Sequence, residues 1–188
     1  MLFLLLSSFL HGCRQEQQTY QPSGDVVKIG FVGPLTGDNS GLGKNSLDGA
    51  RAALQLQPYL LTGDRPEIVV EDDKNDPVRT AAAVERLITE EGVSAILLGS
   101  SSKAVLSVVE RIEEKKVPSI ALLASHPQVS KGDYIAQLPF DDVLQGTVAA
   151  LFVVDEMIVD RVAVFVESDG VHSSFLAETF STKFIEAG

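Results

Sequence analysis

The sequence predicts a doubly wound α/β fold, in which helices cover both faces of a parallel sheet. After Asp25, short apolar runs rich in β-branched residues alternate with segments that carry an apolar stripe at helical spacing. The runs are nearly continuous, as expected of strands that are buried on both faces. Strands and helices in alternation form a parallel sheet joined by right-handed crossovers. We therefore expect a lobe of this class.

Five runs are predicted to be strands, with helices between them. The strands span residues 26–32, 68–70, 95–98, 119–123 and 162–166. The helical stripes, with apolar residues three or four positions apart, are Leu47, Ala50 and Leu54; Ala81, Val84 and Ile88; Val105, Val108, Val109 and Ile112; Leu144, Val148 and Leu151; and Leu176, Phe180 and Phe184. Pro58 is expected to end the first helix, because proline cannot continue one.

The N-terminus predicts an exported, lipid-anchored protein. Residues 1–10 are almost wholly apolar, but a run of about ten residues is too short to cross a bilayer and is typical of a signal-peptide core. Leu-His-Gly-Cys at residues 10–13 resembles a bacterial lipoprotein cleavage box, although no Lys or Arg precedes the cysteine. We predict a signal peptide at residues 1–12, a lipidated Cys13 and a polar tether over residues 13–25. The alternative is an ordinary secretory signal with an incidental cysteine.

Composition limits the possible partners. Cys13 is the only cysteine, so no disulfide can form within the chain and the fold depends on its core. The formal net charge of −11 argues against nucleic acid as a partner, because that binding needs clustered Lys and Arg. Only three histidines are present. We therefore expect no metal site and no cofactor.

A glycine-rich segment joins the first strand to the first helix. Residues 28–50 contain Gly33, Gly37, Gly41 and Gly43, which let the backbone approach a ligand or another part of the chain closely. Two nucleotide-binding patterns are excluded. The first is the Walker motif: its spacing before Gly-Lys is one residue too long here, and no Ser or Thr follows the lysine. The second is the dinucleotide-binding motif, which needs its glycines directly after the strand, whereas here they come later.

The same segment resembles a known family. Residues 29–54, IGFVGPLTGDNSGLGKNSLDGARAAL, look like the opening of the type I periplasmic-binding-protein family, in particular the branched-chain amino-acid binding proteins of ABC importers. The resemblance continues through residues 69–102, 115–125 and 161–188. It therefore covers nearly all of the chain after Asp25.

The resemblance implies a solute-binding protein that holds an amino acid or similar small carboxylate between two lobes and presents it to ABC permease subunits. Members of this family are longer. We therefore expect an N-terminal lobe at residues 26–158 and the start of a second, truncated lobe at residues 159–188. The implied location is periplasmic or cell-surface, with membrane contact through the lipid anchor only.

A serine cluster follows the third predicted strand. Gly99, Ser100, Ser101 and Ser102 are expected to end that strand and open a helix. Hydroxyls and free N–H groups at a helix start suit an anion such as a carboxylate, but a plain serine N-cap explains the same residues. The resemblance favours a ligand role for the three serines, at the strand ends where open α/β sheets bind ligands. A serine nucleophile is not expected, because no G-x-S-x-G motif is present.

The resemblance extends the predicted site to four further residues. Ala124 and Ser125 match an alanine and a threonine that help to hold the ligand's ammonium and carboxylate, although Ala-Leu replaces the family's Ser-Pro just before them. Leu42 is expected to lie against the ligand's side chain. His172 stands where the family often has a tyrosine that covers the ligand from the second lobe. A surface histidine near a helix start is the alternative.

An acidic segment and one histidine suggest metal binding, but neither fits it. Residues 71–77, EDDKNDP, contain carboxylates that calcium would take, yet Pro77 falls where a third ligand would be and no glycine follows. Asp76 before Pro77 is instead a good helix N-cap. His126 has no other ligands to join and is expected to be a loop residue.

Two other classes of function compete with solute binding. An enzyme is disfavoured, because no nucleophile, base and orienting group can be assembled from the sequence. A lipid-anchored sensory or cell-envelope interaction protein stays open, since one fold serves unrelated functions. Neighbouring permease and ATPase genes would favour the receptor over this alternative.

Overall fold

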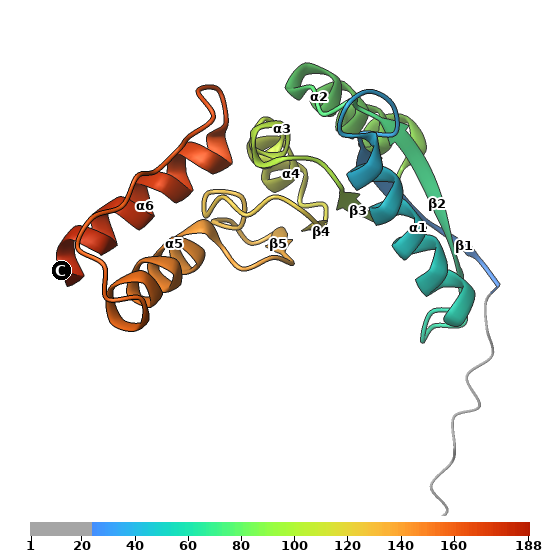
Figure 1. The fold of residues 1–188 in the computed structure, drawn as a ribbon. Helices are drawn as coiled ribbons and strands as arrows, with labels where there is room; N and C mark the ends of the chain where they lie inside the picture. Colours follow the sequence, from blue (N-terminus) through green and yellow to red (C-terminus); the bar gives the residue numbers. More distant parts are fainter. Residues whose placement is uncertain (1–23) are drawn as a thin grey trace, which may run out of the picture.

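The computed structural model describes residues 24–188, so the predicted signal peptide, Cys13 and nearly all of the predicted tether lie outside the described residues. The elements in chain order (Figure 1) are β1 (Val26–Gly33), α1 (Ser40–Leu56), β2 (Arg65–Asp72), α2 (Pro77–Arg86), the π-helical turn η1 (Leu87–Glu91), β3 (Ala95–Leu98), α3 (Ser102–Leu106), α4 (Val109–Lys115), β4 (Ser119–Ala121), β5 (Ile135–Gln137), α5 (Asp142–Leu151), the π-helical turn η2 (Phe152–Glu156) and α6 (Val171–Ala187). The five strands form one parallel sheet in the order β2-β1-β3-β4-β5. The predicted α/β class with a parallel sheet is confirmed.

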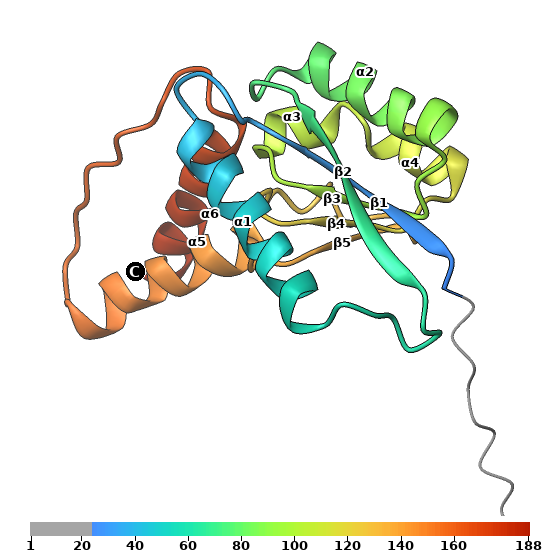
Figure 2. The same cartoon turned by 90° about the vertical axis from the view of Figure 1, so that its right-hand side faces the viewer.

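The helices next to the sheet are divided between its two faces. α1 lies on one face, whereas α2, α3 and α4 lie on the other (Figure 2). The core fills the space between the sheet and this second group, and its fully buried members include Val32, Leu87, Ile96, Val105 and Ile112. The opposite face is less well covered near the edge of the sheet, where Ile120 of β4 is 42% exposed. The expectation of strands buried on both faces therefore fails for β4.

Four of the five predicted strands form, and one does not. Residues 162–166 lie in an irregular, exposed segment, where Phe165 is 96% exposed. A strand needs a neighbour that accepts and donates its backbone hydrogen bonds, and in the described part of the chain no strand pairs with this segment. Conversely, β5 was not predicted, because three residues are too few to show a periodic pattern.

The stripe from Val105 to Ile112 forms two short helices rather than one. The break falls at Ser107, whose hydroxyl donates to the carbonyl oxygen of Ala104 at 2.7 Å and lies 3.0 Å from that of Pro77. Such bonds compete with the helical ladder. The predicted N-cap of α2 is confirmed, because the Asp76 side chain accepts from the N–H of Arg79 at 2.9 Å.

Two other helix predictions need correction. α1 begins at Ser40, so Gly41 and Gly43 belong to its first turns rather than to the preceding loop, and it ends before Pro58 as predicted. In α2, Val84 of the predicted stripe is buried, but Ala81 is exposed. Thr80, Ala83 and Leu87 complete the buried face instead.

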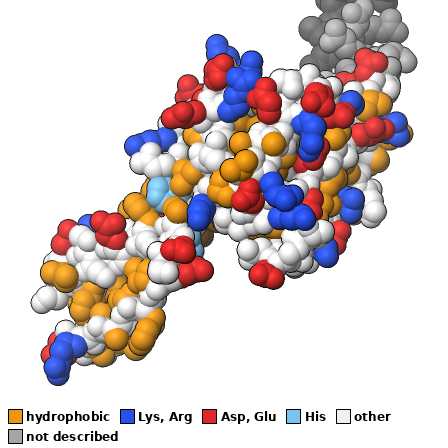
Figure 3. Space-filling model, turned by 90° about the horizontal axis from the view of Figure 1, so that it is seen from above, with side chains coloured by type: hydrophobic (Ala, Val, Ile, Leu, Met, Phe, Trp, Pro, Cys, Tyr) orange, Lys and Arg blue, Asp and Glu red, His pale blue; other side chains and the backbone are white. Residues whose placement is uncertain are grey.

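α5 and α6 lie beside each other, to one side of the sheet (Figure 1). A Cβ at Gly146 of α5 would lie 2.9 Å from side-chain atoms of Thr179 in α6. The small residues Gly146 and Ala150 therefore form the buried face of α5, and the predicted stripe of Leu144, Val148 and Leu151 is exposed. Hydrophobic side chains gather over this part of the molecule in Figure 3. None of the helices within residues 24–188 combines the length and apolar character that a membrane span requires.

Candidate functional site

A cavity of about 360 Å³ opens at the carboxyl ends of β1, β3 and β4. Carboxyl ends of parallel strands meet at one edge of the sheet, which is the usual ligand position in open α/β folds. The lining residues are Pro34, Asn39, Leu42, Asn75, Gly99, Ser101, Ser102, Leu123, Ser125, Pro139, Gln145 and His172. Predicted residues on α1, on the loops after β3 and β4, and on α6 thus lie around one space.

Asp72 holds the loop after β1 in place. Its carboxylate accepts from the N–H of Leu35 at 2.8 Å and from the Thr36 hydroxyl at 2.6 Å, and also from the N–H groups of Thr36 and Lys74. Partial burial alone would raise the pKa of Asp72, but these hydrogen bonds, led by that from the Thr36 hydroxyl, lower its pKa below the usual value. The loop that leads to Leu42 is therefore anchored by an ionised carboxylate.

The start of α1 is fixed by close backbone packing. A Cβ at Gly43 would lie 2.1 Å from the carbonyl oxygen of Pro34, so no larger residue fits there without movement. This contact presses the first turn of α1 against the end of β1. Leu42, one residue earlier, is 56% exposed and lines the cavity. Its contact with a ligand stays a prediction.

Of the three predicted serines, Ser101 and Ser102 line the cavity, whereas Ser100 holds the neighbouring loop in place. Ser100 is buried, and its hydroxyl donates to the carboxylate of Asp73 rather than lining the cavity. Ser101 lines the cavity, but its N–H donates to the Asn75 side chain at 2.9 Å. α3 has only five residues, too few to develop the full dipole expected at a helix start.

Ser102 connects the two loops that follow β3 and β4. Its Oγ accepts from the N–H of Ser125 at 3.1 Å and from the N–H of His126 at 3.2 Å. Because both lone pairs are used, the hydroxyl hydrogen of Ser102 is left to donate to a ligand. Ala124 is fully buried in the core and does not line the cavity with its side chain, whereas Ser125 does.

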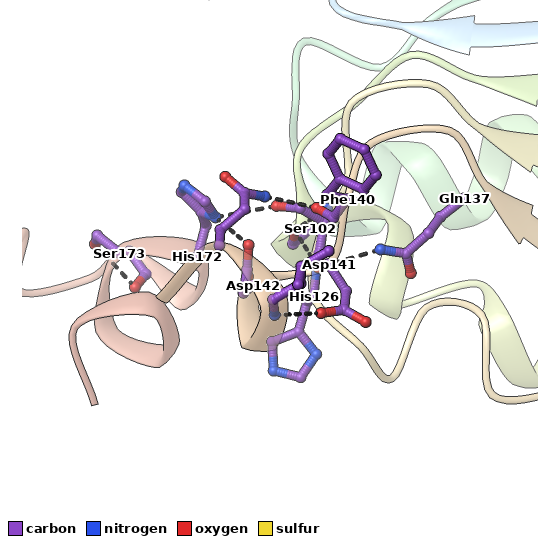
Figure 4. Close-up of polar contacts among 12 residues, drawn as sticks. Ser102, His126, Gln137, Phe140, Asp141, Asp142, His172 and Ser173 are labelled. Carbon is purple, nitrogen blue, oxygen red and sulfur yellow. Dashed lines mark hydrogen bonds and ion pairs between the residues drawn. The ribbon is translucent and has the colours of Figure 1, made fainter. Parts of the chain in front are cut away.

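A cluster of Ser125, Asp142 and His172 joins the sheet to α5 and α6. Nδ1 of His172 lies 2.9 Å from Oδ1 of Asp142 and 3.1 Å from Oγ of Ser125. Asp142 is fully buried, its N–H donates to the carbonyl of Ser125, and its Oδ2 has no hydrogen-bond partner in the described structure. Figure 4 shows His172 extending from α6 toward Asp142.

This cluster lacks the geometry of a catalytic triad. In a triad the serine and the carboxylate bind different nitrogens of the histidine, but here both oxygens share Nδ1. The arrangement holds α6 against the loop after β4 and does not activate Ser125 as a nucleophile. Within residues 24–188, no group of three His, Cys, Asp or Glu side chains could hold a metal ion.

Some lining residues were not predicted. Asn75 adopts a left-handed conformation with φ of 61°, which asparagine tolerates better than most residues. The sequence Lys-Asn-Asp-Pro could therefore have predicted a turn at this position. Asn39 lies in the glycine-rich segment, three residues before Leu42, whereas Gln145 and the neighbouring Asp142 reach the site only through the position of α5. His126 is a loop residue as expected, with its ring 4.6 Å from that of Phe175.

A parallel sheet with a cavity at the carboxyl ends of its strands is the arrangement found in ligand-binding α/β proteins. Residues 26–188 match the periplasmic binding protein family, and the chain belongs to that family. The chain is 25% identical over 166 residues to Leu/Ile/Val-binding protein homolog 6 of Brucella abortus. The predicted resemblance and the type I fold are confirmed.

Solved structures agree with this assignment. A leucine-binding protein from Thermotoga maritima is 32% identical with a TM-score of 0.80, over 86% of this chain and 46% of that protein. A solute-binding protein from R. palustris in complex with 4-hydroxybenzoate is 25% identical with a TM-score of 0.77, over 87% of this chain and 45% of that protein. The Brucella match spans 87% of this chain and 42% of the relative. The chain therefore spans less than half the length of the relatives that it matches.

Proposed function

We propose that this chain supplies the ligand-holding N-terminal lobe of an extracytoplasmic solute-binding protein for an ABC importer. The ligand is an amino acid, of branched-chain type by analogy with the relatives, or a similar small carboxylate. The observation that carries the proposal is the cavity at the strand ends, where Ser102 has a free hydroxyl hydrogen beside Ser125. The names of the Brucella and Thermotoga relatives refer to leucine or to Leu/Ile/Val, and the R. palustris structure contains a carboxylate.

Each predicted residue receives a role in this proposal. Ser102 and the N–H groups at the start of α3 bind the carboxylate, and Ser125 with the backbone of Ala124 lies near the ammonium. Leu42 contacts the side chain of the ligand, and His172 covers it from α6. Ser101 borders the cavity, whereas Ser100 supports the loop through Asp73 and does not contact the ligand.

Calorimetric titration of the full-length protein against an amino-acid panel tests these roles. The Ser102→Ala and Ser125→Ala double variant should weaken binding of the best ligand by at least about a hundredfold, because hydrogen bonds to charged groups contribute ~1.5 to 3 kcal/mol each. Ser94→Ala, at an exposed position before β3, is the control and should bind normally. Unchanged affinity in the double variant, or binding only of ligands without a carboxylate, contradicts the assignment.

The membrane anchor forms a separate part of the proposal. The Leu-His-Gly-Cys sequence after the apolar run supports lipidation of Cys13, which would hold the protein at the membrane surface in the periplasm or on the cell exterior. Mass spectrometry of the native protein should find a mature chain that starts at a modified Cys13. An unmodified N-terminus elsewhere, or a Cys13→Ser variant that stays in the membrane fraction, contradicts the anchor.

A lipid-anchored sensory or cell-envelope interaction protein is the second candidate. The exposed apolar face of α5 and η2, which includes Leu144, Val148 and Phe152, is the observation in its favour. Co-purification with permease subunits supports the transport function. Failure of the full-length protein to bind any amino acid or small carboxylate, together with capture of an envelope protein instead, supports the second candidate.

A further inference from the structure

A second cavity adjoins the first on the side of α6. It has a volume of about 460 Å³, and five residues line both cavities: Asn39, Asn75, Ser101, Ser102 and His172. The two spaces are therefore parts of one cleft. The imidazole of His172 and the serines stand at their common boundary.

The second cavity is lined mainly by groups that form hydrogen bonds. Besides the shared residues it is bordered by Lys103, Glu167, Asp169 and Ser173, and by Gly170 and Val171. Within the described residues Lys103 forms no hydrogen bond or ion pair with its ammonium group. An aliphatic side chain gains affinity from apolar walls, at about 25 cal/mol per Å² buried. Val171 is the only large aliphatic residue here, so the lining suits a polar group instead.

The orientation of His172 is fixed by its own contacts. Nδ1 faces two oxygens, Oδ1 of Asp142 and Oγ of Ser125. A carboxylate can only accept, so Nδ1 carries the hydrogen. Nε2 then has no hydrogen-bond partner among the described residues and is the nitrogen available to a ligand in the cleft.

We infer that His172 and Lys103 form a second polar subsite, and that the ligand carries a hydrogen-bonding group beyond its α-carboxylate rather than a branched aliphatic chain. This inference rests on the proposed function, since it places the α-carboxylate at Ser102, but it replaces the branched-chain side chain considered there with a polar one. In the lining of this cavity Lys103 supplies a donor, and Glu167 and Asp169 supply acceptors. A carboxamide, which both donates and accepts, is the chemical class that satisfies both kinds of group.

Matched ligands test the inference on the full-length protein. Asparagine and leucine have side chains of the same shape, and glutamine extends the carboxamide by one methylene. Titration should show glutamine or asparagine binding at least about tenfold tighter than leucine, the equivalent of one or two added hydrogen bonds. Tighter binding of leucine overturns this inference but leaves the proposed function standing. Failure of every α-amino acid to bind overturns the inference, and failure of small carboxylates to bind as well overturns the proposed function.

Two substitutions separate ligand recognition from a structural role of His172. Asn can replace Nδ1 as a donor to Asp142 but has no counterpart of Nε2. His172→Asn should therefore keep the thermal stability and lose about three- to tenfold more affinity for the carboxamide ligand than for leucine. His172→Gln, which places its amide nearer Nε2, should retain more of the carboxamide preference.

Lys103→Met should also lower carboxamide affinity selectively, with Lys44→Met as its control. Lys44 is exposed in α1 and lines neither cavity. Equal losses for leucine and glutamine in the His172 and Lys103 variants would show a general effect on the cleft and would overturn the inference.

Discussion

The sheet lobe, meaning the five strands with helices α1 to α4, encloses a buried apolar core, whereas the α5–α6 pair leaves most of its apolar residues exposed or only partly buried. Nearly all of the buried hydrophobic residues lie between Phe31 and Ile135, whereas Ala150 is the only one that α5 and α6 contribute. Large exposed hydrophobic side chains crowd the segment from Leu138 to Phe165 instead. The sheet and its helices enclose a core, but two helices packed only on each other bury one face each. The lobe therefore carries the stability, and the α5–α6 pair contributes to the site through polar contacts.

The same substitution placed in both regions gives the largest expected contrast. Leu87→Ala removes a fully buried side chain that packs on Gly30 beneath the sheet, and it should lower the free energy of unfolding by about 2 to 5 kcal/mol. Leu144→Ala, at a helical position that is 47% exposed, should cost less than about 1 kcal/mol. Urea denaturation of residues 24–188 measures both. Similar losses would mean that α5 is part of the stabilising core.

Two glycines of α1 sharpen the comparison within the sheet lobe. Gly43→Ala places a Cβ against the Pro34 carbonyl and should destabilise by about 1 to 3 kcal/mol through overpacking. Gly49→Ala meets nothing within 4 Å and should stabilise by about 0.5 to 1 kcal/mol, because alanine is the better helix former. Thermal unfolding distinguishes them. A neutral Gly43→Ala would indicate that the first turn of α1 is loosely held.

The strands of the sheet lobe could be predicted because the buried apolar residues that stabilise the lobe form continuous runs in the sequence. Continuous apolar runs report burial on both sides, and four of them became strands. The run at residues 162–166 has the same apolar pattern, but no strand of the described chain pairs with it. The stripe of Leu144, Val148 and Leu151 was assigned to the wrong face because the pattern cannot show that Gly146 allows close helix packing.

The site could be predicted only as far as the strand ends. Ser102 and Ser125 line the cavity because they lie in the segments that follow β3 and β4, and such positions can be predicted from the sequence. Ser100 turns away, since the neighbouring buried carboxylate of Asp73 takes its hydroxyl. Asp142 joins His172 through the packing of α5 on α6. Neither contact can be predicted from the spacing of residues in the sequence.

Asp72 makes the stability of the lobe depend on pH. Because its pKa is lowered on folding, its contribution is fully present above the unfolded value of 3.8 and is lost as the pH falls through the lower folded value. Asp72→Asn should cost about 1 to 2 kcal/mol at pH 7, and the difference from wild type should shrink below about pH 3.5. Asp48→Asn, an exposed position in α1, is the control. A difference that is constant from pH 7 to pH 3 contradicts this account.

The smallest effect on stability is expected in the segment before α6. Phe165 is 96% exposed, so Phe165→Ser should change the unfolding free energy of residues 24–188 by less than about 0.5 kcal/mol. Exposed apolar patches promote association and bind hydrophobic dyes, and this substitution should lower both dye fluorescence and the apparent mass in sedimentation. Thr62→Ser, at an exposed position before β2, should change neither. Either of two results would contradict this account: a large loss of stability in the Phe165 variant, or a sharp monomeric melt of the wild-type chain without dye binding. Each would show that this segment is packed in solution and that the two regions differ less than the structure indicates.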